Sequence, residues 1–394
     1  MTTSHPNFDE VIERRGTHSA KWDKMEAFCG VSPTDGIPMW VADMDFRPPQ
    51  VVTQAVHDYA AHGVFGYFGD DDAYLNAITW WMKNRHGWDV DAGHIFSTHG
   101  LVNGTGMCVE AFTQPGDGVV MFTPIYHAFF RVIRAAGRQV VECPMMLNDG
   151  RYTLDFNRYD GMMTGTEKML VFCSPHNPGG RVWTEAELQG VLEFAKRHDL
   201  IIVSDEIHHD LIMPGQKHIP MANIPGASDR LVMMSAATKT FNLAGMHTGN
   251  VIISDPDLRR DFEMKMSALG MSPNAFAKHM IPAAYSPEGA QWVDALMEYI
   301  DGNRKVFDDG MRQIPGVKSM DLEGTYLAWV DFADTGMEAT EVQRRILKDA
   351  KIAVNHGDSF GAGGATFQRF NLATPRARVV EAVERMQKAF ADLQ

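Results

Sequence analysis

Residues 231–245, "LVMMSAATKTFNLAG", place a lysine between two threonines shortly after a short apolar run. The run "LVMMS" (231–235) is typical of a buried strand, and a glycine-containing turn follows Lys239. A lysine that only needs solvent does not require this setting, whereas a lysine that performs chemistry benefits from it. The stretch therefore predicts a strand followed by a reactive amine.

Similar apolar runs recur from about residue 94 onward and alternate with helical patterns. Most of these runs lack polar alternation, as expected of strands that are covered on both faces. One intervening helix is marked by the capping box of Thr184 and Glu187, and another by an amphipathic stripe over residues 379–390. The alternation predicts an α/β fold. Besides 231–235, the expected strands are residues 94–97, 118–123, 138–144, 168–174, 200–204 and 250–254.

The composition is that of a globular protein with a large core, because hydrophobic residues make up 45% of the 394 residues and charged residues 22%. Acidic residues outnumber basic ones by 50 to 36 without any Lys/Arg block, so nucleic acid is not an expected partner. The four cysteines are widely spread, which argues against a disulfide or metal framework. No run reaches the ~18 apolar residues of a membrane span, and the polar start lacks a signal core. We therefore expect a cytoplasmic protein.

Polar or aromatic residues follow several of the expected strands, at the end where open α/β sheets bind ligands. Gly100 opens a helix after the first strand, and backbone N–H groups at a helix N-terminus can hold a phosphate. Tyr126 follows the second strand, and Asn177 lies in the turn "PHNPGG" after the fourth. Each has a simpler explanation on its own, as an ordinary strand-to-helix turn, a core tyrosine or a turn asparagine.

Asp205 follows the strand at 200–204 and begins the run "DEIHHD". A carboxylate at the end of a buried strand must be paired or hydrogen-bonded, which makes it a candidate functional group. His208, His209 and Asp210 in the same run suggest a metal ion. Adjacent residues of an extended segment point to opposite faces, however, so one ion is hard to bracket. We therefore expect no metal there.

Together these residues supply one rim of the sheet with a phosphate cradle, an aromatic ring, an amide donor, a carboxylate and the amine of Lys239. This set suits pyridoxal 5'-phosphate, whose flat ring carries a phosphate and whose aldehyde condenses with a lysine amine. Asp205 is the group that the chemistry needs opposite the pyridine nitrogen, because it keeps that nitrogen protonated and the ring able to accept electrons.

At these residues the sequence resembles the fold-type I pyridoxal-phosphate enzymes of the aspartate aminotransferase superfamily. More narrowly, it resembles the cystathionine β-lyases of the MalY/PatB type. The matching stretches span nearly the whole chain in family order. They are "KWD" (21–23), "PMWVADMDF" (38–46), "FGYF" (65–68), "STHGLVNG" (97–104), "TPIYHAF" (123–129), "CSPHNPGGRVW" (173–183), "VSDEIHHDL" (203–211), "TKTFNLAG" (238–245), "EGTYLAWVDF" (323–332) and "RFNLATPR" (369–376).

The resemblance implies an aspartate-aminotransferase-like architecture, in which a large domain with a central, mostly parallel sheet is joined to a smaller α/β C-terminal domain. The Ser, Pro and Gly residues in "AYSPEGAQ" (284–291) agree with a domain boundary in that region. The expected division is an N-terminal arm at 1–45 that joins the small domain, a cofactor-binding domain at 46–288 and the small domain at 289–394.

The resemblance also implies a role for each residue at the cofactor ring. Lys239 forms the Schiff base with the cofactor and, once displaced by substrate, shuttles the α-proton. Asp205 pairs with the pyridinium nitrogen, and Tyr126 stacks on the ring. His208 lies near the phenolic oxygen, where many relatives have a tyrosine, and Asn177 donates to the same oxygen.

The phosphate contacts implied by the resemblance are the amides of Gly100, Leu101 and Val102, with the hydroxyl of Thr238 as a further contact. One position departs from the pattern of many aminotransferases. They have an arginine eight residues after the lysine to grip the phosphate, and this chain has His247 there. The departure agrees with the lyase branch, but histidine is the weaker phosphate anchor.

For the substrate, the resemblance implies that Arg369 binds the α-carboxylate bidentately, through two guanidinium nitrogens, and that Trp40 lines the entrance. Tyr67 is implied to reach the phosphate of the neighbouring subunit's cofactor, which predicts a homodimer. The expected reaction is β-elimination from L-cystathionine or another cysteine S-conjugate, giving a thiol, pyruvate and ammonia. The alternatives are an aminotransferase, which needs the same lysine, aspartate and arginine, and an additional regulatory role through binding another protein.

Overall fold

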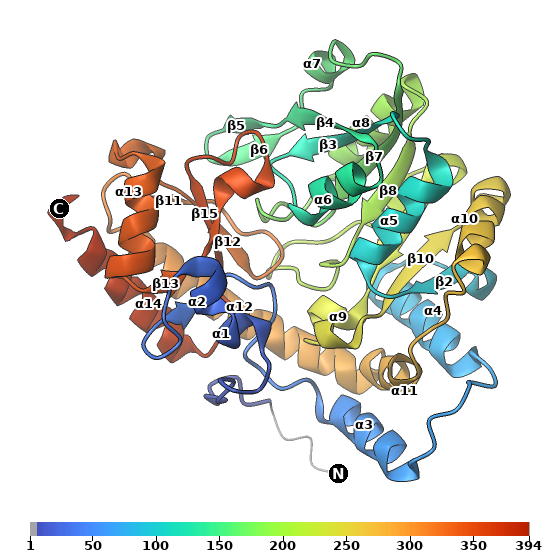
Figure 1. Cartoon of the computed structure of the whole chain (residues 1–394), viewed down its shortest axis with the longest axis horizontal. Coiled ribbons are helices and arrows are strands. Elements are labelled where there is room, and N and C mark those ends of the chain that lie inside the picture. Colours follow the sequence, from blue (N-terminus) through green and yellow to red (C-terminus); the bar gives the residue numbers. More distant parts are fainter. Residues whose placement is uncertain (1–5, 394) are drawn as a thin grey trace.

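The computed structural model describes residues 6–393, and its largest element is a sheet of seven strands. The strands stand in the order β2-β10-β9-β8-β7-β3-β4 (Figure 1). Strand β10 is antiparallel to both neighbours, and all other pairs are parallel. The bounds are β2 Ile95–Thr98, β3 Gly118–Thr123, β4 Gln139–Pro144, β7 Glu167–Cys173, β8 Ile201–Asp205, β9 Leu231–Ser235 and β10 Gly249–Ile253. The predicted α/β fold with a mostly parallel sheet is confirmed.

The main sheet is buried on both faces, which explains why its strands lack polar alternation in the sequence. In β3, Val119 and Met121 belong to one hydrophobic cluster, whereas Val120 and Phe122 belong to the other. Successive side chains of a strand point to opposite faces, so each face has its own core. One face is covered by α5 Leu101–Phe112, α6 Ala128–Ala135 and α10 Pro256–Ala268, and the other by α4 Asp72–His86, α8 Glu185–Arg197 and α11 Ala275–Ala284.

The C-terminal part of the chain forms a second sheet of four antiparallel strands in the order β11-β12-β15-β14. Helix α12, Pro287–Met311, precedes this sheet and packs against both α11 and the last helix (Figure 1). In that last helix, α14, the predicted apolar stripe is buried at Val379, Val383 and Met386. The bounds are β11 Lys318–Ser319, β12 Leu327–Asp331, β14 Asn355–His356, β15 Phe367–Asn371, α13 Ala339–Arg344 and α14 Arg376–Ala389.

The N-terminal segment lies against the C-terminal part of the chain, where α1 and α2 stand beside β13 and α14 in Figure 1. Strand β1, Ile37–Pro38, pairs in parallel with β13, Ile352–Ala353. Farther along, the amide of Asp45 donates to the carbonyl of Ala373 over 2.9 Å. Residues 37–45 thus contact the C-terminal part of the chain, and residues 1–5 lie outside the described part. The exact division into domains stays a prediction.

The remaining α-helices and strands connect the two sheets or flank them, and all of them except α3 are short. They are α1 Ala20–Asp23, α2 Met25–Cys29, α3 Gln50–His62, β5 Met146–Asn148, β6 Arg151–Thr153, α7 Phe156–Asp160 and α9 Ala237–Thr240. The predicted capping box opens α8, where Thr184 Oγ1 accepts from the amide of Glu187 and the carboxylate of Glu187 accepts from the amide of Thr184. Within residues 6–393, no helix combines the length and the apolar character needed to cross a membrane.

Candidate active site

A cavity of about 840 Å³ lies at the edge of the main sheet where the parallel strands end. The residues that sequence reasoning placed after β2, β3, β7, β8 and β9 all reach it, because parallel strands deliver their following loops to one edge. The structure thus brings together nine of the predicted site residues in the lining of one cavity. They are Gly100, Leu101, Val102, Tyr126, Asn177, Asp205, His208, Thr238 and Lys239.

One end of the cavity is formed by the N-terminus of α5. Gly100 caps this helix with φ +93°, a conformation that favours glycine, and a Cβ added there would meet no atom within 4 Å. The first intrahelical bond runs from the amide of Gly104 to the carbonyl of Gly100, so the amides of Leu101 and Val102 have no partner within the helix. Open space in front of unpaired amides suits a phosphate group.

Asp205 is the last residue of β8 and its carboxylate is buried in the cavity wall. Burial raises the pKa of this carboxyl to about 7, against the amide of Ile207, which donates to Oδ1 over 3.1 Å, and against the charge of Lys239. No Lys or Arg among residues 6–393 lies within ion-pair distance of Asp205, and the more distant charge of Lys239 does not offset the cost of burial. A protonated ring nitrogen placed against Asp205 would supply the missing cation.

Lys239 lies in α9, and its amine donates a hydrogen bond to the carbonyl of Ala42 over 2.6 Å. Burial, with a smaller contribution from Arg369, lowers the pKa of this amine to about 8, although the carboxylates of Asp43 and Asp205 act in the opposite direction. A lysine attacks a carbonyl only as the neutral amine, so a lowered pKa increases the reactive fraction near neutrality. Lys239 therefore combines burial with a lowered pKa, as expected of a lysine that reacts with a carbonyl group.

Arg369 comes from β15, in the second sheet, and its guanidinium is 2% exposed. Nη1 donates to Oδ1 of Asn177 over 2.9 Å, and Nη2 donates to the carbonyl of Trp40 and to Oδ1 of Asn355, while Nε has no partner. Its partners are therefore neutral oxygens, and in the described chain no acidic side chain pairs with it. Burial lowers its pKa to about 10. A buried guanidinium of this kind requires an anion, and a carboxylate fits it.

His208 and Tyr126 complete the wall around the space between Lys239 and Asp205. Burial, Lys239 and Arg369 together lower the pKa of His208 well below its usual range, so its imidazole is neutral. Its Nδ1 is buried and has no hydrogen-bond partner. Such an unpaired atom beside the cavity fits a polar atom of a bound molecule.

Three predicted site residues do not line the cavity of this single chain, namely Arg369, Trp40 and Tyr67. Arg369 adjoins the cavity through its hydrogen bond to Asn177, which does line it. The indole of Trp40 donates to the carbonyl of Lys21 over 2.9 Å and stacks on Phe28, although the Trp40 carbonyl does hold Arg369. Tyr67 lies between α3 and α4 with a fully exposed side chain. The predicted roles of Trp40 at the entrance and of Tyr67 in a neighbouring subunit stay predictions.

Other cavity residues were missed by sequence reasoning. Ala42 contributes only its carbonyl, which also accepts from the hydroxyl of Tyr326 over 3.0 Å, and a backbone group leaves no sequence signal. Arg131, on α6, lines the cavity but follows no strand directly. His247, noted as a departure from the family pattern, also lies at the cavity, and a sequence signal for it did exist.

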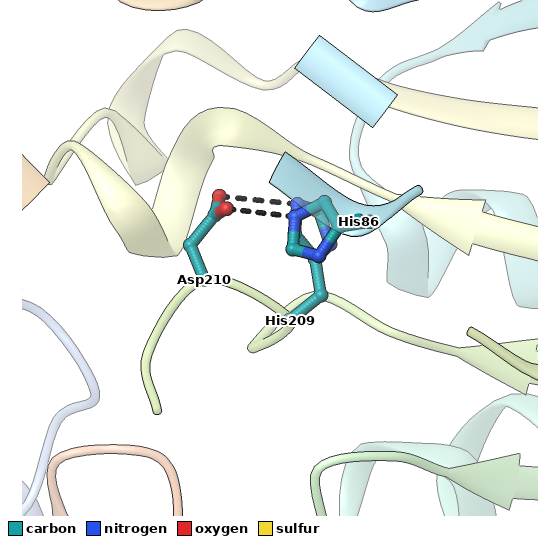
Figure 2. Close-up of side chains that lie close together, drawn as sticks. All are labelled: His86, His209 and Asp210. Carbon is teal, nitrogen blue, oxygen red and sulfur yellow. Dashed lines mark hydrogen bonds and ion pairs between the residues drawn. The ribbon is translucent and has the colours of Figure 1, made fainter. Parts of the chain in front are cut away.

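The predicted arrangement of His209 and Asp210 is wrong. Residues 206–210 form tight turns, in which the amide of His209 donates to the carbonyl of Glu206, so the segment is not extended. His209 and Asp210 therefore converge with His86 from α4, and one ligand atom of each lies within 4.8 Å of the others (Figure 2). Asp210 is 2.9 Å from His86 Nε2 and 3.1 Å from His209 Nε2. The geometric objection to a metal thus fails.

The carboxylate of Asp210 is nevertheless well satisfied by protein donors alone. It accepts hydrogen bonds from the indole of Trp81 over 3.0 Å and from Thr240 Oγ1 over 2.8 Å. Burial opposes its charge, but His209 and His86 outweigh this and hold its pKa well below the usual range, while Asp210 in turn raises the pKa of His209. Thr240 is the last residue of α9 and follows Lys239 directly. Its hydrogen bond to Asp210 therefore anchors α9 to this buried cluster.

The fold and the cavity define an enzyme of the class that holds pyridoxal phosphate on a lysine at the edge of an α/β sheet. The chain belongs to the class I and II aminotransferase family, whose sequence profile matches residues 34–386. The family resemblance inferred from the motifs is therefore confirmed.

Three relatives are similar over nearly their whole length. The cystathionine beta-lyase PatB of Bacillus subtilis is 39% identical over 389 residues, which cover 98% of this chain and 100% of PatB. The crystal structure of cystalysin from Treponema denticola, which contains pyridoxal phosphate, is 37% identical with a TM-score of 0.94 and coverage of 99% and 100%. A pyridoxal-phosphate-bound carbon–sulfur lyase from Staphylococcus hominis, complexed with L-cycloserine, is 28% identical with a TM-score of 0.91 and coverage of 98% and 99%.

Proposed function

We propose that this protein is a pyridoxal-phosphate-dependent carbon–sulfur lyase that acts on L-cystathionine or a related cysteine S-conjugate. With one water, the reaction gives a thiol, pyruvate and ammonia. The observation that carries the proposal is the buried guanidinium of Arg369, which lacks an acidic partner and adjoins the cavity of Lys239 and Asp205. It fits the α-carboxylate of an amino acid. The naming of PatB and of the Staphylococcus hominis enzyme supports the lyase reaction.

The cavity residues fit the cofactor group by group. The amides of Leu101 and Val102 would hold the phosphate, and Asp205 would face the pyridine nitrogen. His208, with its unpaired Nδ1, would lie near the phenolic oxygen together with Asn177. When bound, pyridoxal phosphate supplies an electron sink that stabilises negative charge at the substrate α-carbon.

The chain's own residues then act on the substrate. Arg369 would bind the α-carboxylate and so fix the orientation of the amino acid in the cavity. Lys239, whose pKa is lowered by burial, takes the α-proton as the general base. Departure of the thiolate from the β-carbon then completes the elimination.

A homodimer with shared sites is part of the proposal. Tyr67 stands in a segment whose apolar side chains Val64, Phe65 and Phe68 are also exposed in the single chain. A cluster of exposed large apolar side chains is typical of a protein interface. Partner contact over this segment would bring Tyr67 to the neighbouring cofactor phosphate. A cytoplasmic location is also proposed, and it suits four cysteines that form no disulfide.

The test is a product assay with purified protein, added pyridoxal phosphate and L-cystathionine, without any keto acid. We expect pyruvate, ammonia and homocysteine in equal amounts over many turnovers, and no rate increase on addition of 2-oxoglutarate. If turnover stopped after one equivalent as pyridoxamine phosphate and resumed only with a keto acid, the protein would be an aminotransferase. A pull-down with the Lys239→Ala protein tests the separate regulatory alternative.

A further inference from the structure

One arginine lines the cavity itself, whereas Arg369 adjoins the cavity through its hydrogen bond to Asn177. Arg131 lies on α6, has an exposed side chain and lines the cavity. Apart from Lys239, it is the one Lys or Arg of the cavity lining in the described chain. It lies on the helix that follows Tyr126, which lines the same cavity.

Arg131 forms no hydrogen bond or ion pair within residues 6–393, although acidic groups are near. Glu110 also lines the cavity, but its carboxylate already accepts a hydrogen bond from Arg138 over 2.9 Å and lies 3.9 Å from the amine of Lys265. The cavity lining thus contains a free guanidinium and an occupied carboxylate. An unpaired cation of this kind favours an anionic ligand.

The charges of Arg131 and Arg369 act on the same two residues, Tyr126 and His127. Burial raises the pKa of Tyr126, and the positive charges of Arg369 and Arg131 oppose that rise. Burial and the same two guanidinium groups lower the pKa of His127, the next residue, to about 4. The surroundings of Tyr126 and His127 are therefore electropositive, and the His127 imidazole is neutral near pH 7.

We propose that Arg131 binds a second carboxylate, at the far end of the substrate side chain. The site then prefers cysteine S-conjugates that carry an anionic group beyond the sulfur over neutral or cationic ones. A planar guanidinium is suited to a carboxylate, and a cavity of about 840 Å³ is near the upper end of the ~300–1,000 Å³ range of ligand pockets, with space for cofactor and a long substrate. This inference rests on the proposed lyase function.

The experiment compares two substrates that differ at the far end only, S-(2-carboxyethyl)-L-cysteine and S-propyl-L-cysteine. Arg131→Gln should lower kcat/KM for the carboxylate about 10- to 100-fold through KM, the size expected for one charge-assisted hydrogen-bonded contact, and leave the propyl compound within about twofold. The matched control is Arg134→Gln on the same helix, whose guanidinium lies over the Phe130 ring outside the cavity. It should change neither substrate.

Equal losses for both substrates would overturn the proposal, as would an equal loss in the Arg134→Gln control. Weaker pyridoxal phosphate binding by Arg131→Gln, measured by titration of cofactor absorbance, would assign Arg131 to the cofactor instead. If the wild type eliminates neither compound, the lyase function fails. The ratio of their dissociation constants, measured by calorimetry on wild type and Arg131→Gln holoenzyme, then tests Arg131 separately.

Discussion

Arg369 Nη1 donates a hydrogen bond to Asn177 Oδ1 over 2.9 Å, and this contact joins the second sheet to the loop after β7. Because the amide oxygen of Asn177 is engaged, its NH₂ group is the end left to donate to a bound cofactor. One arginine therefore serves two purposes: it orients a ring contact and presents its remaining donors to a substrate carboxylate.

Arg369→Lys keeps a positive charge but cannot donate to Asn177 and to a carboxylate in the same planar geometry. We expect KM for cystathionine to rise about 10- to 100-fold, together with a shift in the absorbance of the bound cofactor. Steady-state kinetics and absorbance spectra of the holoenzyme measure both. An unchanged KM would show that the α-carboxylate binds elsewhere.

Lys239→Ala should abolish turnover, because the buried amine is both the attachment point and the general base. Borohydride reduction of the wild-type holoenzyme, followed by peptide mass spectrometry, should find the cofactor on Lys239 alone. The surface lysine Lys348, which donates to the carbonyl of Gly30, offers the control Lys348→Ala with normal activity. Cofactor fixed on a different lysine would refute the assignment.

Asp205→Asn should have opposite effects on the apoprotein and on the holoenzyme. The folded-state pKa of Asp205 is raised to about 7, so between pH ~4 and ~7 the folded chain binds a proton that the unfolded chain has lost. Stability of the apoprotein from this group therefore falls as the pH rises through that window and stays low above it.

The neutral amide of Asp205→Asn removes the free-energy cost of burying a charged carboxylate. This cost has an upper limit of about 4 kcal/mol, since one pKa unit corresponds to about 1.4 kcal/mol. Apo Asp205→Asn should melt above apo wild type at pH 8 and not above it at pH 4. The holoenzyme variant should lose most activity, because an amide cannot hold the proton on the ring nitrogen. Calorimetric melting at both pH values, with and without cofactor, decides this prediction.

Tyr67 should act on the site of the other subunit. In a hybrid of a Lys239→Ala chain and a Tyr67→Ala chain, one site then has both lesions and the other has none. Mixing the two inactive variants after unfolding and refolding should restore about a quarter of wild-type activity at a 1:1 ratio with random pairing. A tyrosine that acts within its own chain would give no recovery.

Asp210→Asn should strongly destabilise the chain, because it leaves the His209 imidazole without its buried counter-charge. We expect a loss of about 3–5 kcal/mol in the free energy of unfolding, as for removal of one partner of a buried ion pair. The control is Asp199→Asn, at a side chain that is 98% exposed, with a change below about 1 kcal/mol. Urea denaturation measures both, and addition of Zn²⁺ to the wild type shows whether the cluster also binds a metal.

Much of the site could be predicted because its residues directly follow strands with strong sequence signals. The runs that became β3, β8 and β9 are continuous apolar segments, and Asp205 and Lys239 could be placed from them. Arg369 was found only through the family resemblance, since it lies in a sheet with no recognisable link to the cavity.

The misjudged residues depended on backbone conformation. His209 and Asp210 were expected on opposite faces because the segment after β8 was taken as extended, but turn hydrogen bonds at residues 206–211 fold it back. The contact of Lys239 with the carbonyl of Ala42 connects positions 197 residues apart. No local pattern encodes such a pairing, because any residue can supply a carbonyl.

The N-terminal arm has a consequence for synthesis of the protein on the ribosome. Trp40, whose carbonyl accepts from Arg369, is separated from it by 329 residues, and β1 pairs with β13 from the opposite end of the chain. The N-terminal arm is synthesised first, but it can form these contacts only after β13 and β15 have been synthesised near the end of the chain. Contacts between residues this distant in sequence form slowly. A nascent chain interrupted before β15 lacks Arg369, so we expect prematurely released fragments not to bind amino acids at this site.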